Sequence, residues 1–268
     1  MGIVFFAHPS YLGNRYHGIF DEDYRMRLSS DIRGKQIADW LGVKFNPPKI
    51  SDDDTCIWVK PRNLHKVREC DWVDVSDGGW MSSLLTERPE LRVIAHSEYC
   101  YDYLKKVVAN EIVVIPQQHI NWERQHKKVV KMIGGYIGSP SPVALRIYQE
   151  IGEALGNAGF QFITCFDYKT REDVVNFYKS IDFLVIGPWR DDSPYKTPTK
   201  MINAASFGIP SIAYPLPGYK EWEGNYVRAN DVDEIVTAAK ELKDWPGLVE
   251  TTESYHISKI AEKYRELC

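Results

Sequence analysis

The sequence predicts an α/β protein built from parallel β-sheets, and three observations lead to that fold class. Short apolar runs that suit buried strands alternate along the chain with longer stretches that suit helices. Several of these runs stop at Gly or Pro, the residues that most strongly mark the end of an element. The alternation restarts at about residue 129, after a polar stretch. We therefore expect two Rossmann-like, doubly wound domains.

The first half of the chain contains five apolar runs that we predict to be strands. Each is short and rich in aliphatic or aromatic residues, as expected of strands buried on both faces. They span residues 3–7, 55–59, 72–75, 92–95 and 111–115. Helices are expected at residues 29–41, from residue 80 onward, and at 98–108.

The second half repeats this order. Strands are expected at residues 129–137, 161–166, 183–186, 211–214 and 226–228. Helices are expected at residues 142–155, 171–180, 200–207, 232–242 and 253–267, the last with an apolar face of Ile and Ala residues.

The most specific stretch begins with the apolar run 183–186. A polar loop follows it, and Thr197 and Pro198 then have the order of an N-cap and a first helical residue. The helix predicted from Lys200 ends at Gly208, the residue type favoured after a helix. The expected order is strand, loop, short helix and strand.

The start of this predicted helix suits a phosphate group. Free backbone N–H groups and the positive end of the helix dipole lie there, flanked by Lys196, Thr197, Thr199 and Lys200. Asn203 lies one turn further on, within reach of a sugar hydroxyl. An ordinary capped helix with solvated lysines is the alternative interpretation.

A glycine-rich turn opens the second half of the chain. Gly138 follows the strand that ends at Ile137, and Ser139 comes next. Glycine lets the backbone approach a diphosphate closely, and the helix predicted from residue 142 has its N-terminus nearby. We therefore include Gly138 and Ser139 in a predicted diphosphate site with the helix at residue 200.

The segment TKMINAASFGIPSIAYPLPGYKE resembles the donor-binding signature of GT-B glycosyltransferases, a helix of the type K-x-x-(E/N)-A-x-x-x-G-x-P before a strand. The matching positions are Lys200, Asn203, Ala204, Gly208 and Pro210. The resemblance implies two Rossmann-like domains facing across a cleft. It also implies that the helix start holds the diphosphate of a UDP- or GDP-linked sugar, and that residue 203 meets the ribose.

The sequence departs from this family at one pair of positions. Many members carry a Glu-x7-Glu pair, and here Tyr195 and Asn203 stand at that spacing. The departure leaves the stereochemical course of the reaction open, as either retaining or inverting.

A weaker resemblance sets the domain boundaries. The stretch from Arg92 to Arg124 is similar to the end of the family's N-terminal domain, with Ser97, Ile115 and Pro116 matching. We predict an acceptor-side domain at residues 1–120 and a donor domain at 128–250. A final helix at 251–268 is expected to pack back on the N-terminal domain.

An inverting enzyme also needs a general base near the acceptor hydroxyl. His8 and Asp77 are the predicted catalytic residues, because both follow predicted strands in the acceptor-side half. His17 is a further candidate, and His96 falls at a variable position of the family. For each of them, a structural or solvated role is the alternative.

The composition bears on partners and location. The 268-residue chain has a formal net charge of −4, which gives no electrostatic basis for binding nucleic acid. Its five cysteines are scattered without metal-binding spacing, which indicates free thiols in a reducing compartment. No signal peptide or apolar stretch of ~20 residues is evident, so we expect a cytoplasmic protein without a transmembrane segment.

The chain also has two acidic runs and one segment with basic and aromatic residues. Neither 52–54 nor 191–192 fits a metal-binding motif in this context, and the resemblance implies a metal-independent enzyme without a cofactor besides its substrate. Residues 117–128 are expected to be a solvated linker, with peripheral membrane contact of its basic and aromatic residues as the alternative.

The predicted function is transfer of a hexose-like sugar from a nucleoside-diphosphate sugar to an acceptor, which is a glycan, a lipid-linked molecule or a small molecule. A catalytically inactive nucleotide- or sugar-binding protein of the same fold is the alternative. A nucleotide-sugar epimerase is disfavoured, because no G-x-G-x-x-G follows the first strand.

Overall fold

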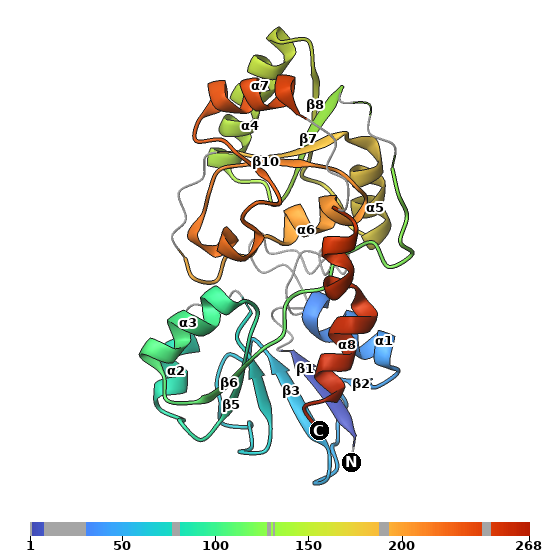
Figure 1. Ribbon diagram of the computed structural model, residues 1–268. Helices are drawn as coiled ribbons and strands as arrows, with labels where there is room; N and C mark the ends of the chain where they lie inside the picture. The colour runs from blue at the N-terminus through green and yellow to red at the C-terminus, as the bar shows by residue number, and fades with distance from the viewer. Residues whose placement is uncertain are drawn as a thin grey trace. The chain divides into compact units, whose positions relative to one another are not determined.

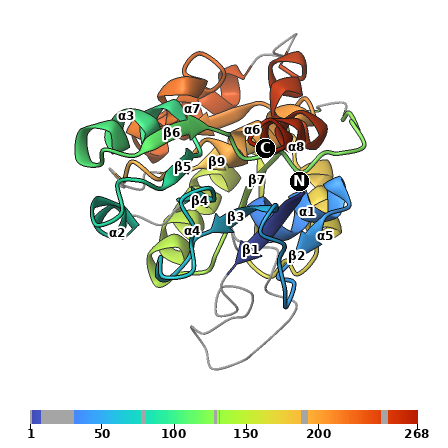
Figure 2. The same ribbon diagram turned by 90° about the horizontal axis from the view of Figure 1, so that it is seen from below.

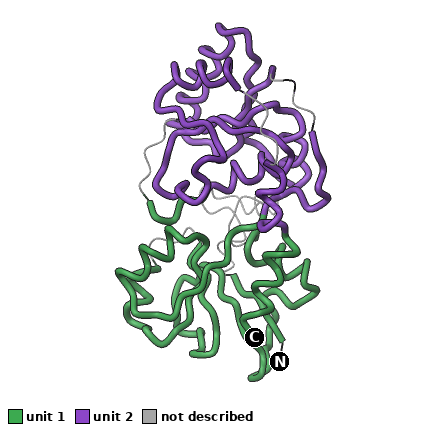
Figure 3. Tube along the Cα trace, in the orientation of Figure 1, with its two compact units in different colours: residues 1–118, 193–197, 257–268 green, residues 119–192, 198–256 purple. Residues whose placement is uncertain are grey.

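The computed structural model describes residues 2–7, 31–76, 81–127, 130, 132–187, 193–242 and 248–268. Contacts divide the chain into two compact units (Figure 3). Unit 1 comprises Met1–Gln118, Ser193–Thr197 and Ile257–Cys268, and unit 2 comprises His119–Asp192 and Pro198–His256. Each unit is built on one parallel sheet (Figure 1).

The sheet of unit 1 has the strand order β2-β1-β3-β4-β5-β6. Every described pairing in it is parallel, as the alternation of strands and helices predicts. The strands are β1 (Ile3–Ala7), β2 (Lys44–Phe45), β3 (Thr55–Val59), β4 (Trp72–Asp74), β5 (Arg92–Ala95) and β6 (Glu111–Val114). All five strands predicted in this half are confirmed, and the two-residue edge strand β2 was not predicted.

Helices cover both faces of this sheet. They are a π-helical turn η3 (Asp31–Lys35), α1 (Gln36–Leu41), α2 (Met81–Thr86), α3 (Glu98–Val107) and α8 (Ile257–Arg265). Figure 2 shows α2 and α3 apart from α1 and α8. Leu85 and Leu104 share one core with Val73 and Val93 of the strands. On the other side, Phe5 of β1 meets Tyr264 of α8 in an edge-to-face contact, with ring centroids 5.3 Å apart.

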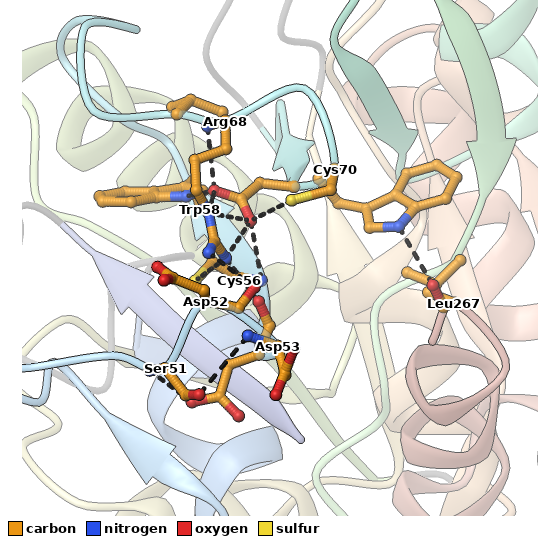
Figure 4. Close-up of polar contacts among 12 residues, drawn as sticks. Ser51, Asp52, Asp53, Cys56, Trp58, Arg68, Cys70 and Leu267 are labelled. Carbon is orange, nitrogen blue, oxygen red and sulfur yellow. Dashed lines mark hydrogen bonds and ion pairs between the residues drawn. The ribbon is translucent and has the colours of Figure 1, made fainter. Parts of the chain in front are cut away.

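Two buried carboxylates join the segments of unit 1. Asp74 accepts from the Arg33 guanidinium at 2.9 Å and from the Tyr264 hydroxyl at 2.8 Å. Asp71 accepts hydrogen bonds from Cys56, Trp58 and Arg68, whose contacts are drawn in Figure 4. Buried carboxylates are tolerated because several donors compensate for their lost hydration.

The sheet of unit 2 has the order β11-β10-β9-β7-β8, again with parallel pairing. Its strands are β7 (Ile133–Ile137), β8 (Gln161–Cys165), β9 (Phe183–Ile186), β10 (Ser211–Ala213) and β11 (Val227–Arg228). Its α-helices are α4 (Pro142–Asn157), α5 (Arg171–Ser180), α6 (Thr199–Ser206) and α7 (Val232–Glu241), and its 3-10 helices are η4 (Pro217–Trp222) and η5 (Glu250–Tyr255).

Strand β9 shows how unit 2 is layered. Side chains alternate between the two faces of a strand. Accordingly, Leu184 and Ile186 pack in a core with residues of α5 and α6, whereas Phe183 and Val185 pack in a second core with residues of α4 and α7. Unit 2 is therefore doubly wound.

The last predicted helix is interrupted. Residues 253–267 were expected to form one helix, but η5 ends at Tyr255, His256 is extended with ψ 142°, and α8 begins at Ile257. The His256 ring Nε2 lies 2.9 Å from the carbonyl of Trp122, and the backbone N–H of His119 donates to the carbonyl of Tyr255. These long-range hydrogen bonds stabilise the chain at the point where the helix is interrupted.

Among the described residues, none of the helices has both the length and the apolar character that crossing a bilayer requires.

Candidate functional site

The candidate site lies in unit 2, at the carboxyl edge of its sheet. Strands β7 and β9 are parallel neighbours, with Gly135 paired to Leu184. Their carboxyl ends therefore meet at one edge, where ligands bind in open α/β sheets. Gly138 follows β7 at this edge, and Gly187 follows β9.

Helix α6 begins at Thr199, and its N-cap is Pro198, which makes no side-chain cap. The prediction that Thr197 caps this helix is wrong by one position, because proline takes the cap and its carbonyl accepts from the Ile202 N–H at 3.0 Å. A helix start without a side-chain cap keeps its dipole and N–H groups directed at whatever lies before it.

Lys200 links the helix start to the glycine turn. Its ammonium nitrogen lies 5.8 Å from the centroid of the Tyr136 ring, within the range of a cation–π contact. Tyr136 belongs to β7, and its hydroxyl lies where a Cβ on residue 138 would be. The structure therefore places both Gly138 and Lys200, which are far apart in sequence, beside the Tyr136 side chain.

Ser139 is exposed beside this turn. Helix α4 begins three residues later and is capped by Ser141, whose hydroxyl accepts from the Ala144 N–H at 3.1 Å. The diphosphate-binding roles of Ser139 and Thr199 stay predictions.

Asn203 has a partner within the protein. Its Oδ1 accepts a hydrogen bond from the backbone N–H of Ile120 at 2.9 Å. The neighbouring hydroxyl of Tyr178 donates to the carbonyl of Lys200 at 3.2 Å. The side chain predicted to meet the ribose thus also holds residue 120 against α6.

The segment around Ile120 was expected to be a solvated linker, and this expectation is wrong. The amide of Asn121 donates to the carbonyl of Ser206 at 2.8 Å, and the Lys127 N–H donates to the carbonyl of Phe207 at 3.0 Å. Arg171 stacks over the Trp122 ring, 4.5 Å from its centroid. Backbone carbonyls left at the end of α6 provide the acceptors that hold this segment.

Lys196 and Thr197 belong to the short segment Ser193–Thr197, which is part of unit 1. Tyr195, in the same segment, is buried in the core of unit 1. Its ring lies 5.8 Å from that of Tyr103 and 6.3 Å from that of His96. The residue at the first position of the family's Glu pair is therefore a core side chain.

The two predicted catalytic residues, His8 and Asp77, lie outside the described residues, as does His17. His96 is described and is 4% exposed. The acidic run at 52–54 forms an exposed turn in which Asp54 accepts from the Ser51 N–H. Within the described part of the chain, no three His, Cys, Asp or Glu side chains are grouped as a metal site would need.

Two residues of the site were not predicted from the sequence. Tyr136 and Tyr148 stack with ring centroids 3.5 Å apart, and the Tyr148 hydroxyl accepts from the Gly187 N–H at 3.1 Å. Burial raises the pKa of Tyr136, which keeps its hydroxyl protonated. The only sequence signal was an aromatic residue two positions before Gly138.

Comparisons with known proteins show which solved structures have a similar fold. No protein-family model and no curated protein matches the sequence. Solved structures do match. A GtfA/B complex has a TM-score of 0.56 at 9% identity, covering 93% of this chain and 60% of that one. TarM has a TM-score of 0.59 at 15% identity, covering 82% of this chain and 55% of that one.

A DNA-modifying β-glucosyltransferase matches along almost its whole length. Its TM-score is 0.50 at 15% identity, with 99% of this chain and 95% of that chain covered. The chain spans little more than half the length of GtfA/B and TarM. These structures are GT-B glycosyltransferases, and at such low identity the likeness establishes a shared two-domain α/β fold.

Proposed function

We propose that this protein is a glycosyltransferase that moves a sugar from a nucleoside-diphosphate sugar to an acceptor. The observation that carries the proposal is that Lys200, at the start of α6, and Gly138, in the turn after β7, both lie beside the Tyr136 side chain. A positive helix end, a lysine and a closely approachable backbone together suit a diphosphate. The similarity in fold to glycosyltransferases supports the same proposal.

The proposed chemistry depends on the leaving group. When the bond between sugar and diphosphate breaks, negative charge grows on the diphosphate. The dipole of α6 and the Lys200 ammonium stabilise that charge more strongly in the transition state than in the ground state. Thr199 and Ser139 supply neutral donors. Under this proposal the protein's own groups provide the charge stabilisation, without a metal.

The acceptor is proposed to be bound by residues of unit 1. His8 and Asp77 remain the proposed bases for its hydroxyl, since each follows a strand of that unit. The facing of the two units across a cleft stays a prediction from the resemblance. The acceptor class is a glycan, a lipid-linked molecule or a small molecule, and the proposed location is cytoplasmic.

Uridine nucleotides are the first donors to test. A TarM mutant was solved with fondaparinux, alpha-GlcNAc-glycerol and UDP, and the β-glucosyltransferase with uridine diphosphoglucose. We propose UDP-linked sugars as the primary candidates and GDP-linked sugars as the second.

A non-catalytic nucleotide- or sugar-binding protein is the second candidate. The observation in its favour is the burial of Tyr195, because no carboxylate stands at this position. Such a protein would keep the diphosphate site of unit 2 and would show nucleotide affinity without turnover.

The test is calorimetric titration with UDP, GDP and ADP in metal-free buffer. Lys200→Ala should weaken binding of the preferred diphosphate by about 1–3 kcal/mol, because it removes a charge-assisted contact. Lys179→Ala is the matched control, since that lysine is exposed in the last turn of α5. Its affinity should equal that of the wild type.

Hydrolysis of the matching nucleotide sugar then separates the two candidates. Release of free sugar by the wild type, and its loss in Lys200→Ala, supports the enzyme. Binding without any hydrolysis or transfer supports the binding protein. If no nucleotide binds to the wild type, the donor-site proposal is refuted.

A further inference from the structure

Tyr136 is held in the site by a chain of contacts from β9. The backbone N–H of Gly187 donates to the hydroxyl of Tyr148 at 3.1 Å. The hydroxyls of Tyr148 and Tyr136 are hydrogen-bonded to each other. The two rings are stacked, with an angle of 15° between their planes. Tyr148 is only 4% exposed, so this arrangement is anchored in the core.

The hydroxyl of Tyr136 is directed along the glycine turn. A Cβ built on Gly138 would run into the Tyr136 hydroxyl and come within 2.7 Å of its ring carbon Cζ. Gly138 does not have a positive φ. The glycine is therefore required by the space that Tyr136 occupies, and not by the backbone conformation.

The hydrogen-bonding capacity of Tyr136 also suits a contact with a ligand at the glycine turn. A phenol hydroxyl both accepts and donates. Because the Gly187 N–H donates to Tyr148, a chain of bonds that runs from Gly187 through Tyr148 to Tyr136 leaves the Tyr136 proton for an acceptor at the turn. Lys200 lies over the same ring, so one side chain presents an O–H donor and also contacts the ammonium.

We propose that Tyr136 is a diphosphate-binding residue, whose hydroxyl donates a hydrogen bond to the donor's diphosphate while its ring positions the Lys200 ammonium. The inference rests on the proposed function, because it assigns a residue to the same donor site. It adds a neutral aromatic donor to the predicted set of Gly138, Ser139, Thr199, Lys200 and Asn203.

The experiment compares UDP with uridine, which lacks the diphosphate. UDP affinity is measured by calorimetry and uridine affinity by competition against UDP, for wild type, Tyr136→Phe and Tyr136→Leu. Tyr136→Phe keeps the ring and loses the hydroxyl, so UDP affinity should fall about tenfold or more while uridine affinity stays within about twofold. Tyr136→Leu should weaken UDP further, because it also removes the cation–π contact.

A second pair of variants tests the same contact from the backbone side. Gly138→Ala should displace the Tyr136 hydroxyl and lower UDP affinity by a similar factor. In the Tyr136→Leu background, the same substitution should have little further effect. Gly156→Ala is the control, because a Cβ there meets nothing within 4 Å.

The outcomes separate this inference from the proposed function. If no nucleoside diphosphate binds to the wild type, both are overturned. If GDP is the one that binds, GDP and guanosine replace UDP and uridine in the comparison. If Lys200→Ala impairs binding but Tyr136→Phe binds UDP like the wild type, the inference alone is overturned. Equal losses of UDP and uridine affinity in Tyr136→Phe would indicate a purely structural tyrosine, and would also overturn it.

Discussion

Asp71 offers the sharpest stability prediction, because its buried carboxylate collects donors from two parts of unit 1. It accepts from the backbone N–H of Cys56 at 3.1 Å, from the Trp58 indole at 3.0 Å and from the Arg68 N–H at 3.0 Å. The Arg68 guanidinium adds an ion pair at 2.8 Å. Figure 4 shows how these groups converge between β3 and the turn before β4.

The perturbation is Asp71→Asn, and its cost follows from counting acceptors. An asparagine has one acceptor oxygen, and its amide group would face N–H donors. An asparagine oxygen in the place of Oδ2 keeps the bonds from the Trp58 indole and the Arg68 N–H, but the amide group then faces the Cys56 N–H, which loses its acceptor at about 1–3 kcal/mol. The ion pair adds little, because the Arg68 side chain is 28% exposed and partly screened. We expect a loss of about 1–3 kcal/mol in the unfolding free energy of unit 1.

Urea unfolding followed by tryptophan fluorescence measures this loss, since Trp58 and Trp72 both lie in unit 1. Asp53→Asn is the matched control. Its carboxylate is exposed in the turn before β3, so the change should stay within about 0.5 kcal/mol. If Asp71→Asn lowers stability by less than 1 kcal/mol, the count of compensating donors is wrong.

Two further predictions concern unit 2. Asn203→Ala removes the acceptor of the Ile120 N–H, so the unfolding free energy should fall by about 1 kcal/mol and the Ile120 amide should exchange faster with deuterium. Asn203→Asp keeps an acceptor and should protect the Ile120 amide from exchange. Equal exchange in both variants would contradict the hydrogen bond between Ile120 and residue 203. Asp182 is buried, which by itself would raise its pKa, but the Lys127 ammonium and the Met132 N–H outweigh this and hold the pKa below its ordinary value of 3.8. The contribution of the ionised Asp182 carboxylate to the free energy of unfolding is therefore complete above the unfolded-state pKa. It disappears as the pH falls through the lower folded-state pKa. Acid titrations should show a steeper loss of stability below about pH 4 in the wild type than in Asp182→Asn, and identical slopes would disprove the linkage.

The strands were predictable because local signals agreed with the tertiary fold. The predicted runs 3–7, 55–59, 92–95 and 183–186 coincide with β1, β3, β5 and β9. Each is a short and mainly apolar run, and burial on both faces of the sheet makes that pattern easy to recognise. Strand β2 has two residues at a sheet edge, too few for any periodic pattern.

The parts of the site that could be predicted are those fixed by topology. Gly138 follows β7, and Lys200 lies in the first turn of the helix after β9; because β7 and β9 are parallel neighbours, these two segments start from the same edge of the sheet. The partners of Asn203 and Tyr195 could not be predicted. Ile120 is 83 residues from Asn203, and no local pattern indicates that Tyr195 belongs to the core of unit 1.

The interruption at His256 has a similar cause. Residues 253–267 carry a helical pattern, and intrinsic propensity alone would continue the helix. Contacts with Trp122 and His119, more than a hundred residues away, stabilise the extended conformation instead. Tertiary bonds override a weak local preference here.

The backbone bond between His119 and Tyr255 also bears on the order in which the chain folds. Asp74 and Tyr264 are 190 residues apart, and closing so long a loop is slow, because its entropy must be lost before the contact forms. Unit 2 begins at His119 and ends at His256, so its folding draws the two ends of that loop together. The remaining separation is then short, and α8 reaches unit 1 as a nearby segment. We therefore expect α8 to dock on the rest of unit 1 only after unit 2 has folded.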